Sequence, residues 1–249
     1  IRATEPLYDI VTPDGIGHTV WLIDHETHIY TLNHLFDAIP ALYIADGHHR
    51  TAAAIRYGQA RRAAAQDPTG DENFESFMAV VFPHDQLKIM DYNRIVKDLN
   101  GRTKEQFLAE VGEKFDIAPN ATRTPQALHS FGMFLDGQWY TLTAKPGTFD
   151  AADPVKALDV SILQENLLGP ILGIQDPRTD TRIDFAGGIR GMDYLEQRVK
   201  AGAAVAFSMF PTSLVELMDV ADAGQIMPPK STWFEPKLRS GLLVRVYEG

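Results

Sequence analysis

The chain has 249 residues, of which 45% are hydrophobic and 22% charged, an ordinary composition for a globular protein with a sizeable core. Its formal net charge of −10 argues against a nucleic-acid backbone as the main partner, because proteins that bind nucleic acids usually carry a basic face. The absence of cysteine from the sequence excludes disulfides, thiolate metal sites and cysteine nucleophiles.

No uninterrupted apolar run in the sequence suggests a membrane span, and its start has no signal-peptide pattern. We therefore expect a soluble, cytoplasmic protein without a membrane or nucleic-acid partner. The expected fold class is α/β with a mixed sheet, and α+β is the alternative.

The first forty residues predict a strand and a helix. Residues 1–17 carry turn signals and are expected to form loop or edge structure. Residues 19–24 have the composition of a strand, whereas 29–39 have the apolar spacing of a helix that ends before a proline. Between them, His25 and His28 lie in a turn-like run, where their spacing favours solvated side chains over a metal site.

The most informative stretch of the sequence comes next. The apolar run Leu42–Ala45 predicts a buried strand, and an alanine-rich segment predicts a helix that begins within two residues of His48 and extends to about residue 66. We call Asp46–Arg50, the predicted turn between them, the DGHHR corner. Gly47 lets the backbone turn there without a Cβ clash.

The DGHHR corner has the composition of a phosphate site. The first N–H groups of a helix lack partners and attract anions, and cationic side chains follow the glycine directly. Alternatively, Asp46 caps the helix and the histidines are solvated. We favour function, with Asp46 or His48 as the general base, or Asp46 as a ligand of Mg²⁺, because several costly polar groups meet at one turn. The predicted phosphate-binding residues here are Gly47, His49, Arg50 and Thr51.

Two apolar runs after a polar loop predict a hairpin. Residues 76–82 have the pattern of a strand buried on both faces, and 87–96 would return beside it. The second run contains Asp91, Asn93 and Arg94, and a buried strand carries such groups only if they are paired or line a cleft. We predict that Asn93 and Arg94 bind the ligand, with a structural ion pair as the equal alternative.

We predict that the middle of the chain is structural and contains no site residue. Residues 103–115 predict an amphipathic helix, and Thr103 and Gln106 fit its capping box. Asp136-Gly137 suits the tight turn of a hairpin within 131–142.

A stretch rich in Pro, Gly and Asp at 145–154 is the expected domain boundary, with a phosphate-binding region over 1–150 and an α/β subdomain over 151–249 packed on it. The elements predicted beyond it are a helix at 160–172 capped by Asp159, a strand at 183–186, a helix at 192–200, a strand at 203–210 and a helix that Thr212-Ser213 cap. Gly187-Gly188 permits close approach to a ligand but equally marks a tight turn. The sequence leaves open whether the sheet is parallel or mixed.

Residues 227–241 form a second notable segment, which we call the cationic stretch. It lacks the glycines of a Walker A loop. The predicted ligand-binding residues in it are Lys230, Ser231 and Thr232, and further cations are Lys237 and Arg239. Trp233 and Phe234 would stack on a base or cover a pocket, and the alternative is a surface loop anchored by its aromatic residues. Residues 242–247 predict a final strand.

The sequence resembles domain-of-unknown-function family 1015, an uncharacterised bacterial and archaeal family. The segments that carry the resemblance are 42–53, 77–101, 176–188 and 227–242. More distantly, the DGHHR corner is similar to that of the ParB, sulfiredoxin and free-serine-kinase superfamily, which implies a ParB/sulfiredoxin-like core that binds nucleotide or phosphoryl groups there. Sulfiredoxin-like members carry a cysteine in this motif, so sulfiredoxin chemistry gains no support. Family members are longer, and we expect a natural N-terminal part ahead of Ile1.

These observations predict a protein that binds phosphate or a nucleotide, ATP or ADP, and that acts as a small-molecule kinase or phosphotransferase with Mg²⁺ as an expected cofactor. The resemblance makes serine or phosphoserine the first metabolite to test. The alternatives are a non-catalytic nucleotide-binding regulator, and a phosphoester hydrolase that uses His48 or His49. A homo-oligomer is compatible with the sequence.

Overall fold

The computed structural model describes residues 2–119 and 122–247, and its internal contacts define two compact units, 1–44 and 45–249. The smaller unit contains a hairpin and a helix. Their bounds are β1 (Tyr8–Val11), β2 (Gly17–Val20) and α1 (Glu26–Asp37). The hairpin is antiparallel, with Tyr8 opposite Val20. His25 is the N-cap of α1, and its ring accepts a hydrogen bond from the Thr27 N–H, so a capping role explains this histidine.

The larger unit is built on a six-stranded sheet in the order β5-β7-β6-β9-β4-β8, and every neighbouring pair is antiparallel. Its strands are β4 (Tyr92–Val96), β5 (Phe115–Pro119), β6 (Ser130–Leu135), β7 (Gln138–Ala144), β8 (Ile183–Gly187) and β9 (Val205–Ser208). The predicted class, a fold of both helices and strands, is confirmed, but the expected mixed sheet is wrong, because the sheet is neither parallel nor mixed but antiparallel throughout. The boundary expected near residue 150 remains a prediction, and strands from both sides of it share this sheet.

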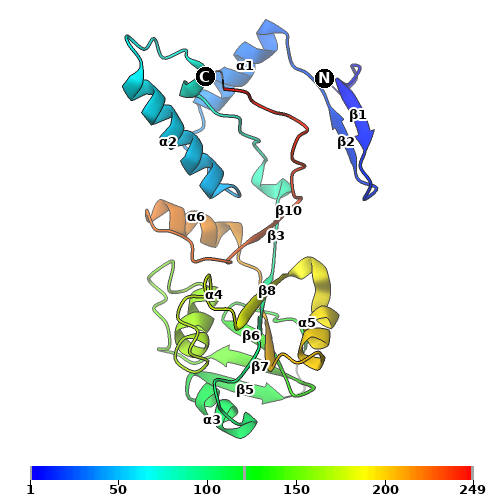
Figure 1. The fold of residues 1–249 in the computed structure, drawn as a ribbon, viewed down its shortest axis with the longest axis vertical. Coiled ribbons are helices and arrows are strands. Elements are labelled where there is room, and N and C mark those ends of the chain that lie inside the picture. Colours follow the sequence, from blue (N-terminus) through cyan, green and yellow to red (C-terminus); the bar gives the residue numbers. More distant parts are fainter. Residues whose placement is uncertain (1, 120–121, 248–249) are drawn as a thin grey trace. The chain divides into compact units, whose positions relative to one another are not determined.

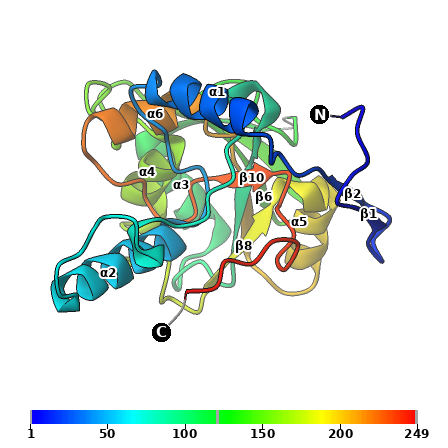
Figure 2. The same cartoon turned by 90° about the horizontal axis from the view of Figure 1, so that it is seen from above.

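Helices cover both faces of the sheet (Figures 1 and 2). Their bounds are α3 (Lys104–Lys114), α4 (Asp159–Leu163) with a π-helical turn at Gln164–Leu168, and α5 (Gly191–Lys200). The main core includes Phe107 of α3, Leu163 of α4 and Phe131 of β6. On the opposite face, Leu195 of α5 packs with Ile95 in a smaller cluster.

The local signals of the middle segment are confirmed. Thr103 and Gln106 form the predicted capping box of α3. Asp136 and Gly137 both have positive φ between β6 and β7, as a tight hairpin turn requires. The predicted cap Asp159 is wrong, because Leu158 is the N-cap of α4. The Asp159 carboxylate instead accepts a hydrogen bond from the His129 N–H at 2.8 Å.

A two-stranded ribbon and helix α6 form a third apolar cluster. The ribbon pairs β3 (Lys88–Met90) with β10 (Trp233–Glu235), with Ile89 opposite Phe234, and α6 spans Leu214–Asp222 behind the predicted cap, Ser213. Ile89, Leu217 and Phe234 are buried together, and Ala45 packs against them. Phe234 is therefore core and cannot stack on a base.

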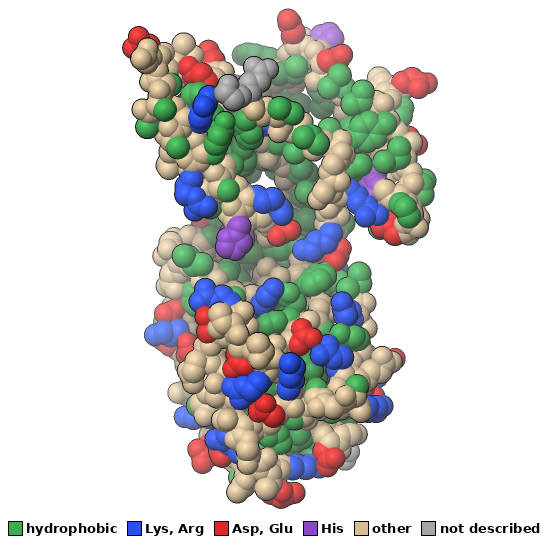
Figure 3. Space-filling view, viewed as in Figure 1, with side chains coloured by type: hydrophobic (Ala, Val, Ile, Leu, Met, Phe, Trp, Pro, Cys, Tyr) green, Lys and Arg blue, Asp and Glu red, His purple; other side chains and the backbone are tan. Residues whose placement is uncertain are grey.

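Three predicted strands are wrong. Residues 42–45, 76–82 and 242–247 belong to no strand, and most of their apolar side chains are exposed. On the face drawn in Figure 3, hydrophobic side chains lie at the surface. The predicted hairpin of 76–82 with 87–96 is also wrong, because that second run divides into β3 and β4, which pair with β10 and with β8 and β9. A segment with strand propensity forms a strand only when its backbone hydrogen-bonds to a neighbouring strand. Among the described residues, no strand pairs with these segments.

Candidate functional site

The DGHHR corner places a helix start where the sequence predicts it. Helix α2 spans His48–Ala64, and Gly47 is its N-cap with a φ of +90°, a left-handed conformation that side chains other than glycine rarely adopt. A Cβ added to Gly47 would also lie 2.8 Å from Nη2 of Arg50. The Arg50 guanidinium therefore folds back over Gly47, beside the start of the helix.

Asp46 does not cap α2. Its Oδ1 accepts a hydrogen bond from the Gly47 N–H at 2.9 Å, and no side chain caps this helix in the described part of the chain. Its Oδ2 lies 4.0 Å from Arg50 and 3.7 Å from Nζ of Lys237. The Asp46 side chain is 59% exposed and that of Arg50 is 79% exposed, so water screens this ion pair strongly and an anionic ligand can compete for the cations.

The remaining residues of the corner are open to solvent. His48 and His49 are exposed in the first turn of α2, and Thr51 is half-buried, with its N–H bonded to the Gly47 carbonyl at 2.9 Å. A helix start without a side-chain cap presents N–H dipoles to an anion. The histidines and Arg50 are therefore available to a ligand at the same place.

Lys237 brings the cationic stretch to the corner. Its ammonium lies 3.7 Å from Asp46 and 5.3 Å from the centroid of the Trp233 ring. Trp233 in turn packs edge-on against Tyr92. The two segments that the sequence singled out thus meet, and the residue that joins them is Lys237.

Asn93 of β4 is buried with both ends of its amide in use. Its Oδ1 accepts the Met209 N–H at 2.9 Å, and its Nδ2 donates to Oδ2 of Asp91. The bond from Met209 holds β4 to the segment after β9, and the two bonds together account for an asparagine in a buried strand. Its predicted contact with a ligand remains untested.

Arg94 is 3% exposed and has no ion-pair partner among the described residues. Its Nη1 donates to the Tyr92 carbonyl, and its Nη2 donates to the Lys230 carbonyl at 2.9 Å. The guanidinium also lies 5.6 Å from the centroid of the Phe185 ring. Burial lowers the pKa of Arg94 to about 10, so the group still carries its charge at neutral pH.

Lys230 has a left-handed backbone, with a φ of +59°. Its ammonium lies 5.7 Å from the ring centroid of Tyr92 and 5.8 Å from that of Phe185. The next residue, Ser231, is buried, and its hydroxyl donates to the Pro228 carbonyl at 2.6 Å. Thr232 is half-buried. Lys230 is therefore the exposed cation of the predicted Lys-Ser-Thr group, while the Ser231 hydroxyl is engaged within the protein.

Gly187 and Gly188 allow two side chains to approach the backbone closely. A Cβ on Gly187 would lie 2.6 Å from the Trp233 ring, and one on Gly188 would overlap the Asp91 carboxylate. The Gly188 N–H also donates to the Asp91 carbonyl at 2.7 Å. These contacts account for both glycines without a ligand.

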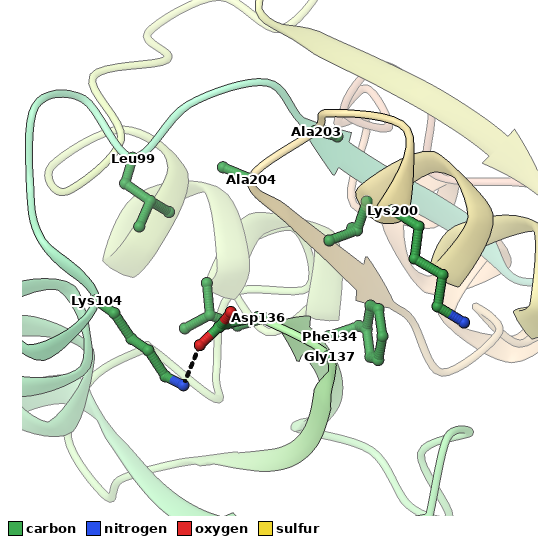
Figure 4. A pocket seen from close by; sticks show the side chains of 10 residues that line it. Leu99, Lys104, Phe134, Asp136, Gly137, Lys200, Ala203 and Ala204 are labelled. Atoms are coloured by element: carbon green, nitrogen blue, oxygen red, sulfur yellow. Dashed lines mark hydrogen bonds and ion pairs between the residues drawn. The ribbon is translucent and has the colours of Figure 1, made fainter.

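A pocket of about 370 Å³ lies elsewhere in the larger unit (Figure 4). Its basic side chains are Lys104, which pairs with Asp136 at 2.7 Å, and Lys200, which pairs with Glu196 at 3.3 Å. Each of these lysines therefore has its own carboxylate partner, and the pocket contains no unpaired cation among its described residues. In the described ranges 2–119 and 122–247, no cluster of three or more His, Asp or Glu side chains could hold a metal ion.

Sequence reasoning gave no site role to Tyr92 or Phe185, and it named Lys237 only as a further cation of the cationic stretch. The period of two in a strand could have identified Tyr92, because residues 92 and 94 must share one face. Phe185 and Lys237 carry no such local signal, since their neighbours lie far away in the sequence.

Comparison with known proteins places the chain in a family. Residues 1–161, well over half of the chain, match the protein family of unknown function DUF1015. The chain belongs to this family. The resemblance predicted from the sequence is thereby confirmed. No curated protein sequence matches this DUF1015 protein.

Three solved structures are similar to this DUF1015 protein at low identity. A mutant free serine kinase in complex with AMP is 15% identical, with a TM-score of 0.39, over 77% of this chain and 66% of that one. Free serine kinase in complex with AMP is 14% identical, with a TM-score of 0.39, over 86% and 80%. A conserved hypothetical protein from Pyrococcus furiosus is 12% identical, with a TM-score of 0.39, over 77% and 68%. The chain thus spans just under two thirds of the first of these proteins.

The helices of the DUF1015 protein give no membrane-spanning candidate. Across the helices that the structure describes, none is both long and apolar enough to cross a bilayer.

Proposed function

We propose that this DUF1015 protein binds a nucleotide or another phosphorylated small molecule at the DGHHR corner and transfers a phosphoryl group to or from a small metabolite. One observation carries the proposal: three sources of positive potential converge at one helix start. They are the uncapped N–H groups of α2, the Arg50 guanidinium above Gly47, and Lys237 at 3.7 Å from Asp46. Phosphoryl transfer depends mainly on positioning and on such charge stabilisation.

Each residue of the corner has a part in this mechanism. Arg50 and the first-turn N–H groups bind phosphate oxygens, with His49 and Thr51 beside them. An incoming phosphate attracts Arg50 and Lys237 and so releases Asp46, which then accepts the proton of an acceptor hydroxyl. His48 is the other candidate for that base, because its exposed ring is in the same turn.

Magnesium fits this arrangement as a partner of the ligand. Mg²⁺ in phosphate sites is usually held by one or two carboxylates together with the phosphates. Asp46 would supply one carboxylate, and His48 would then be the base. The metal would neutralise charge on the phosphate oxygens. Serine and phosphoserine are the first metabolites to test, on the strength of the resemblance alone.

A thermal-shift screen tests the proposal with ATP, ADP, inorganic phosphate and phosphoserine, each with and without Mg²⁺. A ligand at about 100 times its Kd stabilises the folded chain by about 2.7 kcal/mol, and each kcal/mol raises the Tm of a chain of this size by roughly 2–4 °C. Hits then enter turnover assays with serine as the acceptor.

Two charge-removing variants on the same helix make the screen specific. Arg50→Gln should abolish most of the shift, whereas Arg61→Gln, at the other end of α2, should retain it. The absence of a shift with every phosphorylated ligand, or an equal loss in both variants, would refute the proposal. Binding without turnover would replace phosphoryl transfer by a regulatory role.

A further inference from the structure

Arg94 is a buried cation without a counter-charge. Two of its guanidinium N–H groups donate to the carbonyls of Tyr92 and Lys230, and the others have no acceptor in the described part of the chain. A neutral amide could donate to a carbonyl without burying a charge. Because the desolvation of an unpaired ion costs several kcal/mol, these two hydrogen bonds do not explain why an arginine is here.

Lys230 adds a second cation at the same place. Its ammonium and the Arg94 guanidinium lie 5.8 and 5.6 Å from the centroid of one ring, that of Phe185. No ion pair of Lys230 is found among the described residues, in contrast to Lys104 and Lys200 around the pocket of Figure 4. Two like charges near one aromatic ring repel each other unless an anion joins them.

The backbone holds Lys230 in this position at a cost. A lysine in the left-handed region is uncommon, and such strain persists only where the surroundings enforce it. Here the enforcing contact is the hydrogen bond from Arg94 to the Lys230 carbonyl at 2.9 Å. Arg94 thus fixes the peptide of Lys230 while the ammonium stays exposed beside Tyr92 and Phe185.

We propose that Arg94 and Lys230 form a second oxyanion site, which takes a dianionic phosphoryl group above the rings of Tyr92 and Phe185. A dianion matches the two positive charges, and a phosphate ester carries a charge of roughly −1.5 to −2 at neutral pH, whereas a carboxylate carries only one. Arg94 supplies the planar donors, and Lys230 supplies the exposed ammonium. This site does not depend on the activity proposed for the DGHHR corner.

Isothermal titration of the whole chain with inorganic phosphate tests the site. Lys230→Asn removes the charge and keeps a residue that tolerates the left-handed backbone. It should weaken phosphate binding about tenfold or more, as expected for the loss of a charge-assisted contact. The control is Lys97→Gln, which removes the same charge from an exposed residue after the other end of β4 and should leave the affinity within about twofold.

The charge of the ligand gives an independent readout. Inorganic phosphate gains its second negative charge close to neutral pH, so wild-type affinity should fall between pH 7.5 and pH 5.5, while affinity for sulfate, a permanent dianion in this range, should stay constant. Arg94→Gln removes the buried charge and keeps an amide donor for one of the two carbonyls, so the variant should stay folded and should lose phosphate binding. If Arg94 has only a structural role, the Arg94→Gln variant should lose stability and keep its affinity for phosphate.

The outcomes separate the two sites. Loss of phosphate binding in Lys230→Asn supports the inference, whether or not phosphate binding is also lost in Arg50→Lys. Retention in Lys230→Asn together with loss in Arg50→Lys would overturn the inference and leave the function proposed for the corner intact. A wild-type chain that binds neither phosphate nor sulfate would overturn it as well.

Discussion

Single buried polar groups in this protein differ in how well they are satisfied. Asn93 uses both ends of its amide, whereas Asp159 is 5% exposed and its Oδ2 has no hydrogen-bond partner among the described residues. Burial raises the pKa of the Asp159 carboxyl to about 7, against the opposing effect of the His129 N–H bond, and Glu216 adds to the rise. Asp159 is therefore a group whose charge the fold disfavours.

The pH dependence of stability should report this group. Because the folded pKa of Asp159 lies above the unfolded value of about 4, the fold loses stability as the pH rises from roughly 4 to 7, by an amount on the order of 4 kcal/mol. Asp159→Asn removes that loss. Urea unfolding of both proteins at pH 5 and pH 8 should show the variant gaining relative stability at pH 8. Parallel profiles would mean that Asp159 is not protonated in the fold.

Arg50 is the residue on which two-pronged phosphate recognition depends. Arg50→Lys keeps the charge but loses the planar fork, and we expect phosphate-ligand binding to weaken by roughly 1–3 kcal/mol. Stability should hardly change, because the side chain is 79% exposed. Titration calorimetry on the folded variant checks this. Unchanged affinity would refute two-pronged binding, and unfolding would show Arg50 to be structural.

Secondary-structure elements were predictable where their signals are local. Helices α1, α2 and α3 and the β6–β7 hairpin follow from caps, apolar spacing and an Asp-Gly turn. Strand β10 was missed and the strand at 76–82 was wrong, because pairing depends on distant partners that no local pattern reveals. The candidate site also has one part that local sequence predicts and one part that it does not. The DGHHR corner is one contiguous motif, but the contacts of Lys237 with Asp46 and of Arg94 with Lys230 join residues that lie far apart in the sequence.

The contact between β8 and β10 can be tested with glycine substitutions. Gly187→Ala places a Cβ 2.6 Å from the Trp233 ring, which is fixed by Tyr92 and by its bond to Glu235, so we expect a loss of roughly 1–3 kcal/mol in the free energy of unfolding. The control is Gly112→Ala in α3, where the nearest atom is 3.9 Å away and a gain of about 0.5–1 kcal/mol is expected. Chemical denaturation measures both. Equal effects would exclude steric contact as the cause.

At the scale of the whole molecule, burial is concentrated in the six-stranded sheet. Strand β9 is buried at every position, whereas α1 and α2 contain no buried residue. Elements with few buried contacts open locally at low cost in free energy. The DGHHR corner therefore begins a helix that has no buried residue in the core.

Hydrogen exchange should show this division. Amides of β6 and β9 should exchange slowest, and those of α1 and α2 fastest. A phosphorylated ligand at the corner should slow exchange in the first turns of α2, because binding stabilises the ordered helix start. Fast exchange in β9, or slow exchange in ligand-free α2, would contradict the arrangement of the core.

The β3–β10 ribbon also joins two segments that the ribosome makes at different times. Ile89 is synthesised well before its partner Phe234. Until the later segment emerges, Lys230 and Lys237 are absent, and neither Arg94 nor Asp46 has its neighbour. We therefore expect a ribosome-bound chain that stops before residue 230 to bind phosphate more weakly than one that includes β10.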